Sequence, residues 1–370
     1  MSSRRDVLIW GLTAPWLAGC GGGGDAPAND GAVATSIPAN DWATDTPESQ
    51  RVSSANLQAL FAGGAALPFL YSVAVIRNGV LVGEQYFGGA QSSDLRHIAS
   101  CTKTVSSLLT GIALNEGKIS STAATLSTLL ASQLAPTPNA YSAGTTLQQL
   151  LNMRSDQAWD ENTQLPQLDA APSATAFALA LPSDGMPRGY HWNYSTASSH
   201  LISPVLKNAY GMDALAIANA KLFAPLGIQQ AAWQRDPSGE IIGSYGLQLR
   251  TRDLAKIGWM SMQGGLWQGR PVVPTEWLRM SQTSIKFNVP DLGSAGTLTQ
   301  IGYGNLWWTG TLGGQPVVLA WGHGGQFAIL APSLQLVVST QANYHVSMNQ
   351  ADYQEIAILN LVGSFISTLS

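Results

Sequence analysis

The stretch IASCTKTVSSLL, residues 98–109, decides the fold, because an apolar run with helical periodicity starts there beside a serine and a lysine. Ser100 and Lys103 are three residues apart, and positions i and i+3 share one face of a helix. A serine hydroxyl is a weak nucleophile that needs a base, and a buried lysine with a lowered pKa can supply one. The free N–H groups at a helix N-terminus suit an anion forming at Ser100. The stretch predicts a nucleophile helix, although a buried helix with a solvent-reaching lysine is the plainer alternative.

Composition excludes several classes of protein. The 370 residues are 45% hydrophobic, enough for a sizeable core, and 11% charged, against about 25% in typical soluble domains. The net charge is −4 and the single basic cluster is Arg4-Arg5, so we expect no nucleic-acid partner. Five histidines without metal-ligand spacing and scattered glycines predict no metal site and no cofactor. Of the two cysteines, Cys101 is expected to be a small buried residue.

The N-terminus has the pattern of an export signal. Paired arginines precede an apolar segment that ends near Leu17, too short to span a bilayer but suited to a signal peptide. The arginine pair resembles a twin-arginine signal, and LAGC (17–20) resembles a bacterial lipobox in which Cys20 is acylated. We therefore expect a signal peptide at 1–20, a flexible linker at 21–46 and a lipoprotein at the periplasmic face or outer membrane. An ordinary cleaved signal is the alternative.

The rest of the chain predicts an α+β fold. Strand-like residues 70–77 and 80–87 flank Asn78-Gly79, a type I′ hairpin signal. Three more strands are expected near the C-terminus, at 316–321, 326–330 and 334–340. Together they predict a five-stranded antiparallel sheet flanked by helices.

The expected hydrolase domain covers residues 47–370. A helix capped near Ser53 and ended by Gly63-Gly64, and a final helix at about 350–368, are expected to cover one face of the sheet. Strand signals are scarce between residues 120 and 235, which predicts an inserted helical lobe. The α/β lobe then consists of residues 47–119 and 236–370.

A second motif, Tyr194-Ser195-Thr196, lies inside the expected helical lobe. A phenol near a lysine ammonium is expected to have a lowered pKa, so Tyr194 is a candidate to take and return the Ser100 proton. The neighbouring hydroxyls are candidates for a proton relay. An aromatic cluster that packs a loop is the alternative interpretation.

A third motif, HGGQ at residues 323–326, lies between two expected strands. Its glycines allow a substrate to approach a strand backbone. The backbone N–H groups of Gln326 and Ser100 are candidates for an oxyanion hole. A Ser/His/Asp triad through His323 is disfavoured, because the chain contains no G-x-S-x-G elbow.

In this order, S-x-x-K at 100–103, Y-S-T at 194–196 and H-G-G at 323–325 resemble the three motifs of the serine β-lactamase and penicillin-binding-protein superfamily. The resemblance covers most of the chain from about Asp41 and looks closest to the class C-like branch, which includes esterases and 6-aminohexanoate-dimer hydrolases. It implies that Ser100 is the acylated nucleophile and that Lys103 and Tyr194 form the acid/base pair, without deciding which is the base. Oxyanion N–H groups are expected from Ser100 and Gln326, and substrate contacts from Thr196, His323, Gly324 and Gly325.

Two departures point away from antibiotic substrates. Thr196 replaces the usual Asn of Y-x-N, and His323 replaces the usual Lys of K-T-G, which removes a fixed positive charge for a substrate carboxylate. The leading expectation is an exported serine hydrolase that cleaves small-molecule carboxylic esters, with linear amides as a further substrate class. A β-lactamase or D,D-peptidase is the first alternative, and a non-catalytic binder or sensor on the same fold is the second.

Overall fold

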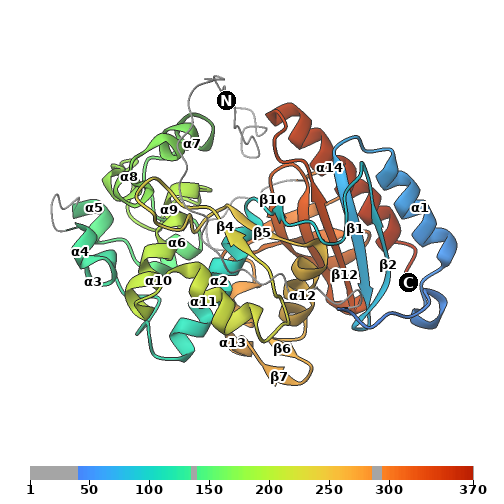
Figure 1. Ribbon diagram of the computed structural model, residues 1–370. Coiled ribbons are helices and arrows are strands. Elements are labelled where there is room, and N and C mark those ends of the chain that lie inside the picture. The colour runs from blue at the N-terminus through green and yellow to red at the C-terminus, as the bar shows by residue number, and fades with distance from the viewer. Residues whose placement is uncertain (1–40, 135–139, 286–293, 370) are drawn as a thin grey trace, which may run out of the picture.

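A computed structural model describes residues 41–134, 140–285 and 294–369. Its centre is a seven-stranded sheet in the order β2-β1-β12-β11-β10-β9-β8, in which neighbouring strands are antiparallel (Figure 1). The strands are β1 Leu70–Arg77, β2 Val80–Tyr86, β8 Thr299–Tyr303, β9 Trp308–Leu312, β10 Gln315–Gly322, β11 Gln326–Ala331 and β12 Leu336–Ala342.

The expected α+β architecture is confirmed, but the expected count of five strands is wrong. The two additional strands are β8 and β9, which extend the sheet beyond β10. Each contains a glycine, Gly302 and Gly310, and a glycine weakens the local strand signal. At both positions an added Cβ would lie under 3 Å from neighbouring atoms, so packing requires the glycines. These strands depend on pairing across the sheet rather than on local propensity.

The N-terminal hairpin forms as predicted. Asn78 and Gly79 have φ values of 52° and 83°, the left-handed conformations that a type I′ turn needs. The turn pairs Arg77 with Val80 and joins β1 to β2. β1 also pairs with β12, so the two ends of the domain share one sheet.

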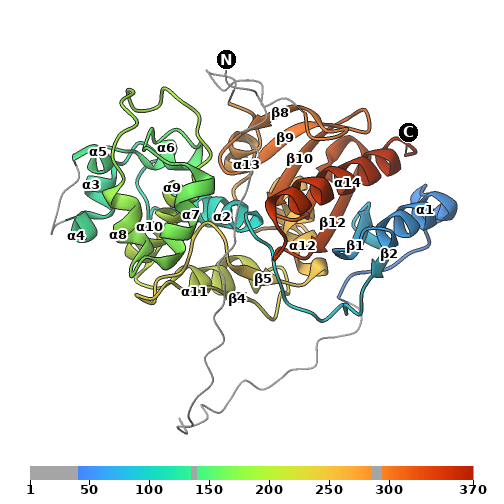
Figure 2. The same cartoon turned by 90° about the horizontal axis from the view of Figure 1, so that it is seen from above.

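Helices cover both faces of this sheet (Figures 1 and 2). On one face, α1 (Ser54–Ala65) packs against α14 (Met348–Ile366). The other face is covered by α12 (Thr251–Met262) and α2 (Cys101–Asn115). Helix α1 runs through the expected stop at Gly63-Gly64, because Gly63 packs against Leu361 of α14 and leaves no room for a Cβ.

A group of short helices lies beside α2, away from the sheet (Figure 1). These helices form a second apolar assembly around α2, since α10 and α11 both contact it. They are α3 Leu126–Leu129, α4 Ala131–Leu134, α5 Ala140–Ala143, α6 Leu147–Leu151, α7 Glu161–Ala170, α8 Ala174–Ala180, α9 Thr196–His200, α10 Ile202–Tyr210, α11 Ala214–Ala218 and the π-helix η3 Asn219–Phe223. The remaining elements are η2 Glu48–Gln50, β3 Arg96–His97, β4 Ala232–Trp233, β5 Leu247–Leu249, β6 Leu266–Trp267, β7 Arg270–Pro271, α13 Thr275–Ser281 and η4 Pro332–Leu334.

The folded domain includes Asp41, the first described residue, although the expected domain began at residue 47 and residues 21–46 were expected to form a linker. Trp42 is buried and its indole donates to the Arg252 carbonyl at 3.1 Å. Asp41 forms an ion pair with Arg250, and both side chains are largely buried. The expected signal peptide and Cys20 lie outside the described residues. Within the described part of the chain, no helix combines the length and apolarity needed to cross a bilayer.

Candidate active site

Ser100 lies at the turn that leads from β3 into α2. The preceding residue, Ala99, has a φ of 45°, a left-handed conformation that is uncommon for a residue with a Cβ. His97 stabilises this turn, because its Nδ1 accepts from the Ala99 N–H at 2.9 Å. Ser100 itself is buried, with 7% of its surface exposed. The turn therefore places the serine at the helix N-terminus without exposing it on the molecular surface.

Lys103 lies one helical turn further along α2 and points back to Ser100. Its Nζ is 2.9 Å from Ser100 Oγ, 3.2 Å from Thr196 Oγ1 and 3.1 Å from the Ser244 carbonyl oxygen. Burial lowers the pKa of this amine to about 7, although the negative charge of Glu161 opposes that shift. The predicted i, i+3 pairing of Ser100 with Lys103 is present. A neutral lysine is thus accessible near neutral pH, as a general base requires.

Tyr194 comes from the loop before α9 and reaches the same point. Its ring centre is 4.9 Å from Lys103 Nζ, and the nearby Ser100 side chain acts to lower its pKa. Burial raises the pKa of Tyr194 well above its usual range. The expectation of a lowered pKa is wrong, because desolvation disfavours the phenolate and Lys103 is itself close to neutral. Tyr194 is therefore a neutral phenol, suited to donating a proton rather than to removing one.

The turn between β10 and β11 carries the third motif to the same end of α2. Gly322 packs against Ile98 and Ala99, and a Cβ there would lie 2.5 Å from the Ile98 carbonyl oxygen. Cys101 is fully buried, as expected, and its thiol donates to the Gln326 carbonyl at 3.2 Å. The peptide of Gln326 thus contacts α2 directly after Ser100. This arrangement brings the two residues expected to form the oxyanion hole, Ser100 and Gln326, onto adjacent elements.

His323 is buried, and burial lowers its pKa. It therefore supplies no permanent positive charge at neutral pH, which agrees with the argument from the missing Lys of K-T-G. The next residue, Gly324, is held from behind by α14. Its N–H donates to Glu355 Oε1 at 2.6 Å, and its carbonyl accepts from Gln354 Nε2.

Sequence reasoning missed Gln354 and Glu355. Glu355 also accepts from the Trp321 indole at 2.8 Å, so it supports the β10–β11 turn at two points. Burial raises the pKa of Glu355 to about 8. No local signal separates this pair from other polar residues of the amphipathic helix α14. Only the packing of α14 behind the turn reveals the contact.

Thr196 and Glu161 form a second contact that the sequence did not predict. Thr196 was expected to bind substrate, but it is 1% exposed and lies between Lys103 and Glu161. Its hydroxyl donates to Glu161 Oε1, and its N–H donates to Glu161 Oε2 at 3.1 Å. Asp160 is the N-cap of α7, and Glu161 is the first residue of that helix. Burial raises the pKa of Glu161, and the nearby Lys103 opposes that shift.

Aromatic side chains enclose the site on one side. Tyr194 stacks on Trp308 with ring centres 5.8 Å apart, and Trp308 lies 5.2 Å from Trp321. Trp192 and Tyr303 complete the cluster through edge-to-face contacts with Trp308. The cluster is largely buried and makes the surroundings of Tyr194 apolar. It fits an apolar group of a substrate better than a charged one.

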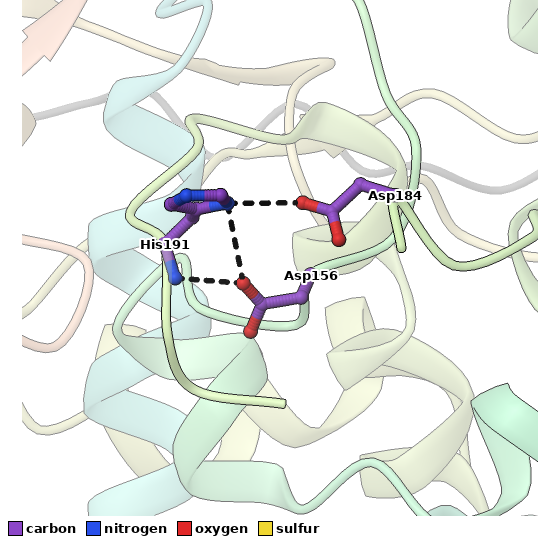
Figure 3. Close-up of side chains that lie close together, drawn as sticks. All are labelled: Asp156, Asp184 and His191. Atoms are coloured by element: carbon purple, nitrogen blue, oxygen red, sulfur yellow. Dashed lines mark hydrogen bonds and ion pairs between the residues drawn. The ribbon is translucent and has the colours of Figure 1, made fainter. Parts of the chain in front are cut away.

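A separate cluster of Asp156, Asp184 and His191 lies near the Tyr194 loop (Figure 3). Their potential ligand atoms are within 4.8 Å of one another, whereas the spacing of histidines in the sequence indicated no metal site. Asp156 is buried and accepts from the N–H groups of Gly189, Tyr190 and His191. These hydrogen bonds account for the position of Asp156, which holds the loop before Tyr194 in place.

The fold is that of the beta-lactamase-like superfamily of serine hydrolases. A family model described as beta-lactamase matches residues 57–362, and the chain belongs to that family. No curated protein sequence matches it significantly.

Several solved structures share the fold at low sequence identity. A protein described as a 6-aminohexanoate-dimer hydrolase from Bacillus anthracis has a TM-score of 0.65 and 20% identity, over 82% of this chain and 80% of that one. A protein described as a beta-lactamase from Bacteroides dorei has a TM-score of 0.68 and 18% identity, over 84% and 97%. EstCE1, a hydrolase with promiscuous acyltransferase activity, has a TM-score of 0.61 and 13% identity, over 84% and 100%. These similarities establish the fold.

Proposed function

We propose that this protein hydrolyses carboxylic esters through an acyl-Ser100 intermediate, with linear amides as a further substrate class. The observation that carries the proposal is the 2.9 Å contact between Ser100 Oγ and the buried Nζ of Lys103. Burial brings the pKa of that amine to about 7, so a substantial fraction is neutral at physiological pH. Inactive scaffolds have no need for a buried lysine held against a serine.

The proposed reaction follows from the protonation states. Neutral Lys103 takes the proton of Ser100 as Oγ attacks the substrate carbonyl, and the oxyanion is bound by the N–H groups of Ser100 and Gln326. The carbonyl carbon then releases the alcohol or amine, which receives a proton from Tyr194, and Tyr194 recovers one from Lys103. A water molecule attacks the acyl-serine with Lys103 as base, which releases the acid and restores Ser100.

The substrate preference rests on charge and apolar surface. Buried His323 with its lowered pKa is neutral, and the aromatic cluster around Trp308 presents apolar surface. A neutral acyl group matches these surroundings better than the carboxylate of a β-lactam. The names of the similar structures, an amide hydrolase and a promiscuous hydrolase among them, support the same range of substrates.

Steady-state hydrolysis of p-nitrophenyl butyrate, 6-aminohexanoate dimer and nitrocefin tests the proposal, with Ser100→Ala as control. Ester turnover that is lost in Ser100→Ala is the expected result. Dominant nitrocefin turnover would favour the β-lactamase alternative, and one-time acylation without turnover would favour a binder or sensor. Full activity in Ser100→Ala would contradict the acyl-serine mechanism.

We also propose that the protein is exported and anchored to a membrane through acylated Cys20. The support is the sequence pattern of paired arginines followed by an apolar segment and LAGC. Mass spectrometry of the mature N-terminus tests this. A diacylglyceryl-modified Cys20 is expected, and a Cys20→Ser variant should leave the membrane fraction.

A further inference from the structure

Besides Ser100, the Ser244 carbonyl and the Thr196 hydroxyl contact the amine of Lys103. The Ser244 carbonyl, 3.1 Å from Nζ, can only accept a hydrogen bond. Thr196 Oγ1, at 3.2 Å, can either donate or accept, depending on where its proton points. A neutral lysine amine has two protons and one lone pair. The direction of the Thr196 hydroxyl therefore decides whether that lone pair is available to Ser100.

Glu161 determines that direction. Its Oε2 faces two groups that can only donate, the Thr196 N–H at 3.1 Å and the Trp159 indole N–H at 2.5 Å. Its Oε1 accepts from the Thr196 hydroxyl. The two fixed N–H donors on Oε2 and the nearby Lys103 favour the ionised carboxylate and oppose the effect of burial. The Thr196 proton is consequently committed to Glu161, and Thr196 Oγ1 presents a lone pair to Lys103.

We infer that Glu161 is a positioning residue that acts through the Thr196 hydroxyl to aim the lone pair of neutral Lys103 at Ser100. Neutral Lys103 donates its two protons to Ser244 and Thr196, and the remaining lone pair faces the Ser100 hydroxyl. Without the carboxylate, the Thr196 hydroxyl is free to rotate and donate to Lys103. It then competes with Ser100 for the only lone pair of the base. This inference rests on the proposed acyl-serine function.

The charge of Glu161 adds a measurable signature. Its carboxylate stabilises the ammonium form of Lys103, so its removal should lower the pKa of that amine further. Among the described residues, the Cys101 thiol and the Tyr194 phenol also lie close to Lys103. Burial raises the pKa of both groups, so both stay neutral across the range in which Lys103 titrates. A change in the acidic limb of the pH profile can thus be assigned to the Glu161–Lys103 pair.

The test compares Glu161→Gln, Thr196→Val and Thr196→Ser by pH-dependent ester hydrolysis. We expect Glu161→Gln and Thr196→Val to lower kcat by about 10- to 100-fold with little change in KM, because only the proton-transfer step is affected. Thr196→Ser retains a hydroxyl and should restore most of the rate lost in Thr196→Val. Glu161→Gln should also move the acidic limb to lower pH. Glu276→Gln makes the same chemical change on an exposed helix and is the matched control.

Wild-type kcat in Glu161→Gln with an unmoved acidic limb would overturn the inference. If Glu161→Gln fails to fold, the Thr196 pair decides, because equal rates in Thr196→Val and Thr196→Ser would also overturn it. A merely structural role would lower the melting temperature without moving the limb, and that result counts against the inference as well.

A substrate-independent readout separates this inference from the proposed function. A fluorophosphonate forms a P–O bond to Ser100 and releases fluoride, while the Ser100 proton passes to Lys103. The labelling rate should fall in Glu161→Gln and Thr196→Val and recover in Thr196→Ser, even if no ester or amide is turned over. NMR titration of 13C-labelled lysine follows the ε-carbon of Lys103 among the six lysines, and its pKa should be lower in Glu161→Gln. An unchanged Lys103 pKa together with unchanged labelling would refute the positioning role alone.

Discussion

Two buried glutamates support the site from opposite sides, and their surroundings differ. Glu161 accepts three hydrogen bonds and lies near the cation of Lys103, which favours its ionised form. Glu355 accepts two hydrogen bonds, and the nearby charge that acts on it is another carboxyl group, Asp352, which raises its pKa further. Burial raises both pKa values, but only Glu161 has a cation to offset it. The same residue type therefore lies beside a cation on the helical side and beside another carboxyl group on the sheet side.

We expect the largest effect from substitution of Lys103, whose charge distinguishes the surroundings of Glu161 from those of Glu355. Lys103→Met removes the base and should lower kcat by about 1,000-fold or more. Its thermal stability should also fall, because the Ser244 carbonyl loses a donor and the buried carboxylate of Glu161 loses its cation. Ester kinetics and thermal unfolding measure the two effects. Retention of more than a tenth of the activity would assign the base role to another group.

The pH dependence of kcat/KM tests the helical side of the site, where Lys103 lies near Glu161. The neutral form of Lys103 is the active base, so kcat/KM should fall about tenfold per pH unit below a pKa of about 7. Above that value the rate should be level, because the pKa of Tyr194 is raised well above its usual range. A profile measured from pH 5 to 9 with a neutral ester checks both limbs. A rate that rises as the pH is lowered through 7 would contradict the assignment.

Stability measurements test the sheet side. The pKa of Glu355 is about 8 in the folded protein and near 4.5 when exposed, so the folded state binds the extra proton between these values. The free energy of unfolding should therefore fall by about 1.4 kcal/mol for each unit by which the pH rises in this window. Glu355→Gln lacks this ionisable group. Its free energy of unfolding relative to wild type should therefore rise by the same amount for each unit of increasing pH. Parallel stability curves for the two proteins would show that Glu355 is ionised at neutral pH, like Glu161.

The smallest expected effect concerns the thiol that joins α2 to the β10–β11 turn. Cys101→Ala removes the hydrogen bond to the Gln326 carbonyl and should cost about 1 kcal/mol of stability. We expect kcat to change by less than about threefold, because α2 and β11 remain packed together. Chemical denaturation and ester kinetics on the same preparation measure both quantities. A loss of kcat as large as that of Glu161→Gln would mean that this contact, too, positions a catalytic group.

Local chemistry made much of the fold predictable. Asn78-Gly79 specifies a tight hairpin, and both residues adopt the left-handed conformations that its turn needs. The Ser100/Lys103 pair follows from helical spacing alone. In contrast, β8 and β9 contain glycines whose role is to allow close packing, so their sequence does not resemble a strand. β9 pairs with the edge of β10, and β8 in turn pairs with β9.

The sequence by itself determined which chemical groups are available: a serine and a lysine on one helix face, a tyrosine, and a glycine-rich turn. The tertiary structure decided their protonation states and their supports. Tyr194 has a raised pKa rather than a lowered one, and Lys103 has a pKa of about 7, because burial removes the water that stabilises a charged form. Glu161 and Glu355 become part of the site only when α7 and α14 pack against its two sides. Burial and contacts between distant segments are properties of the folded chain, and no spacing along the sequence encodes them.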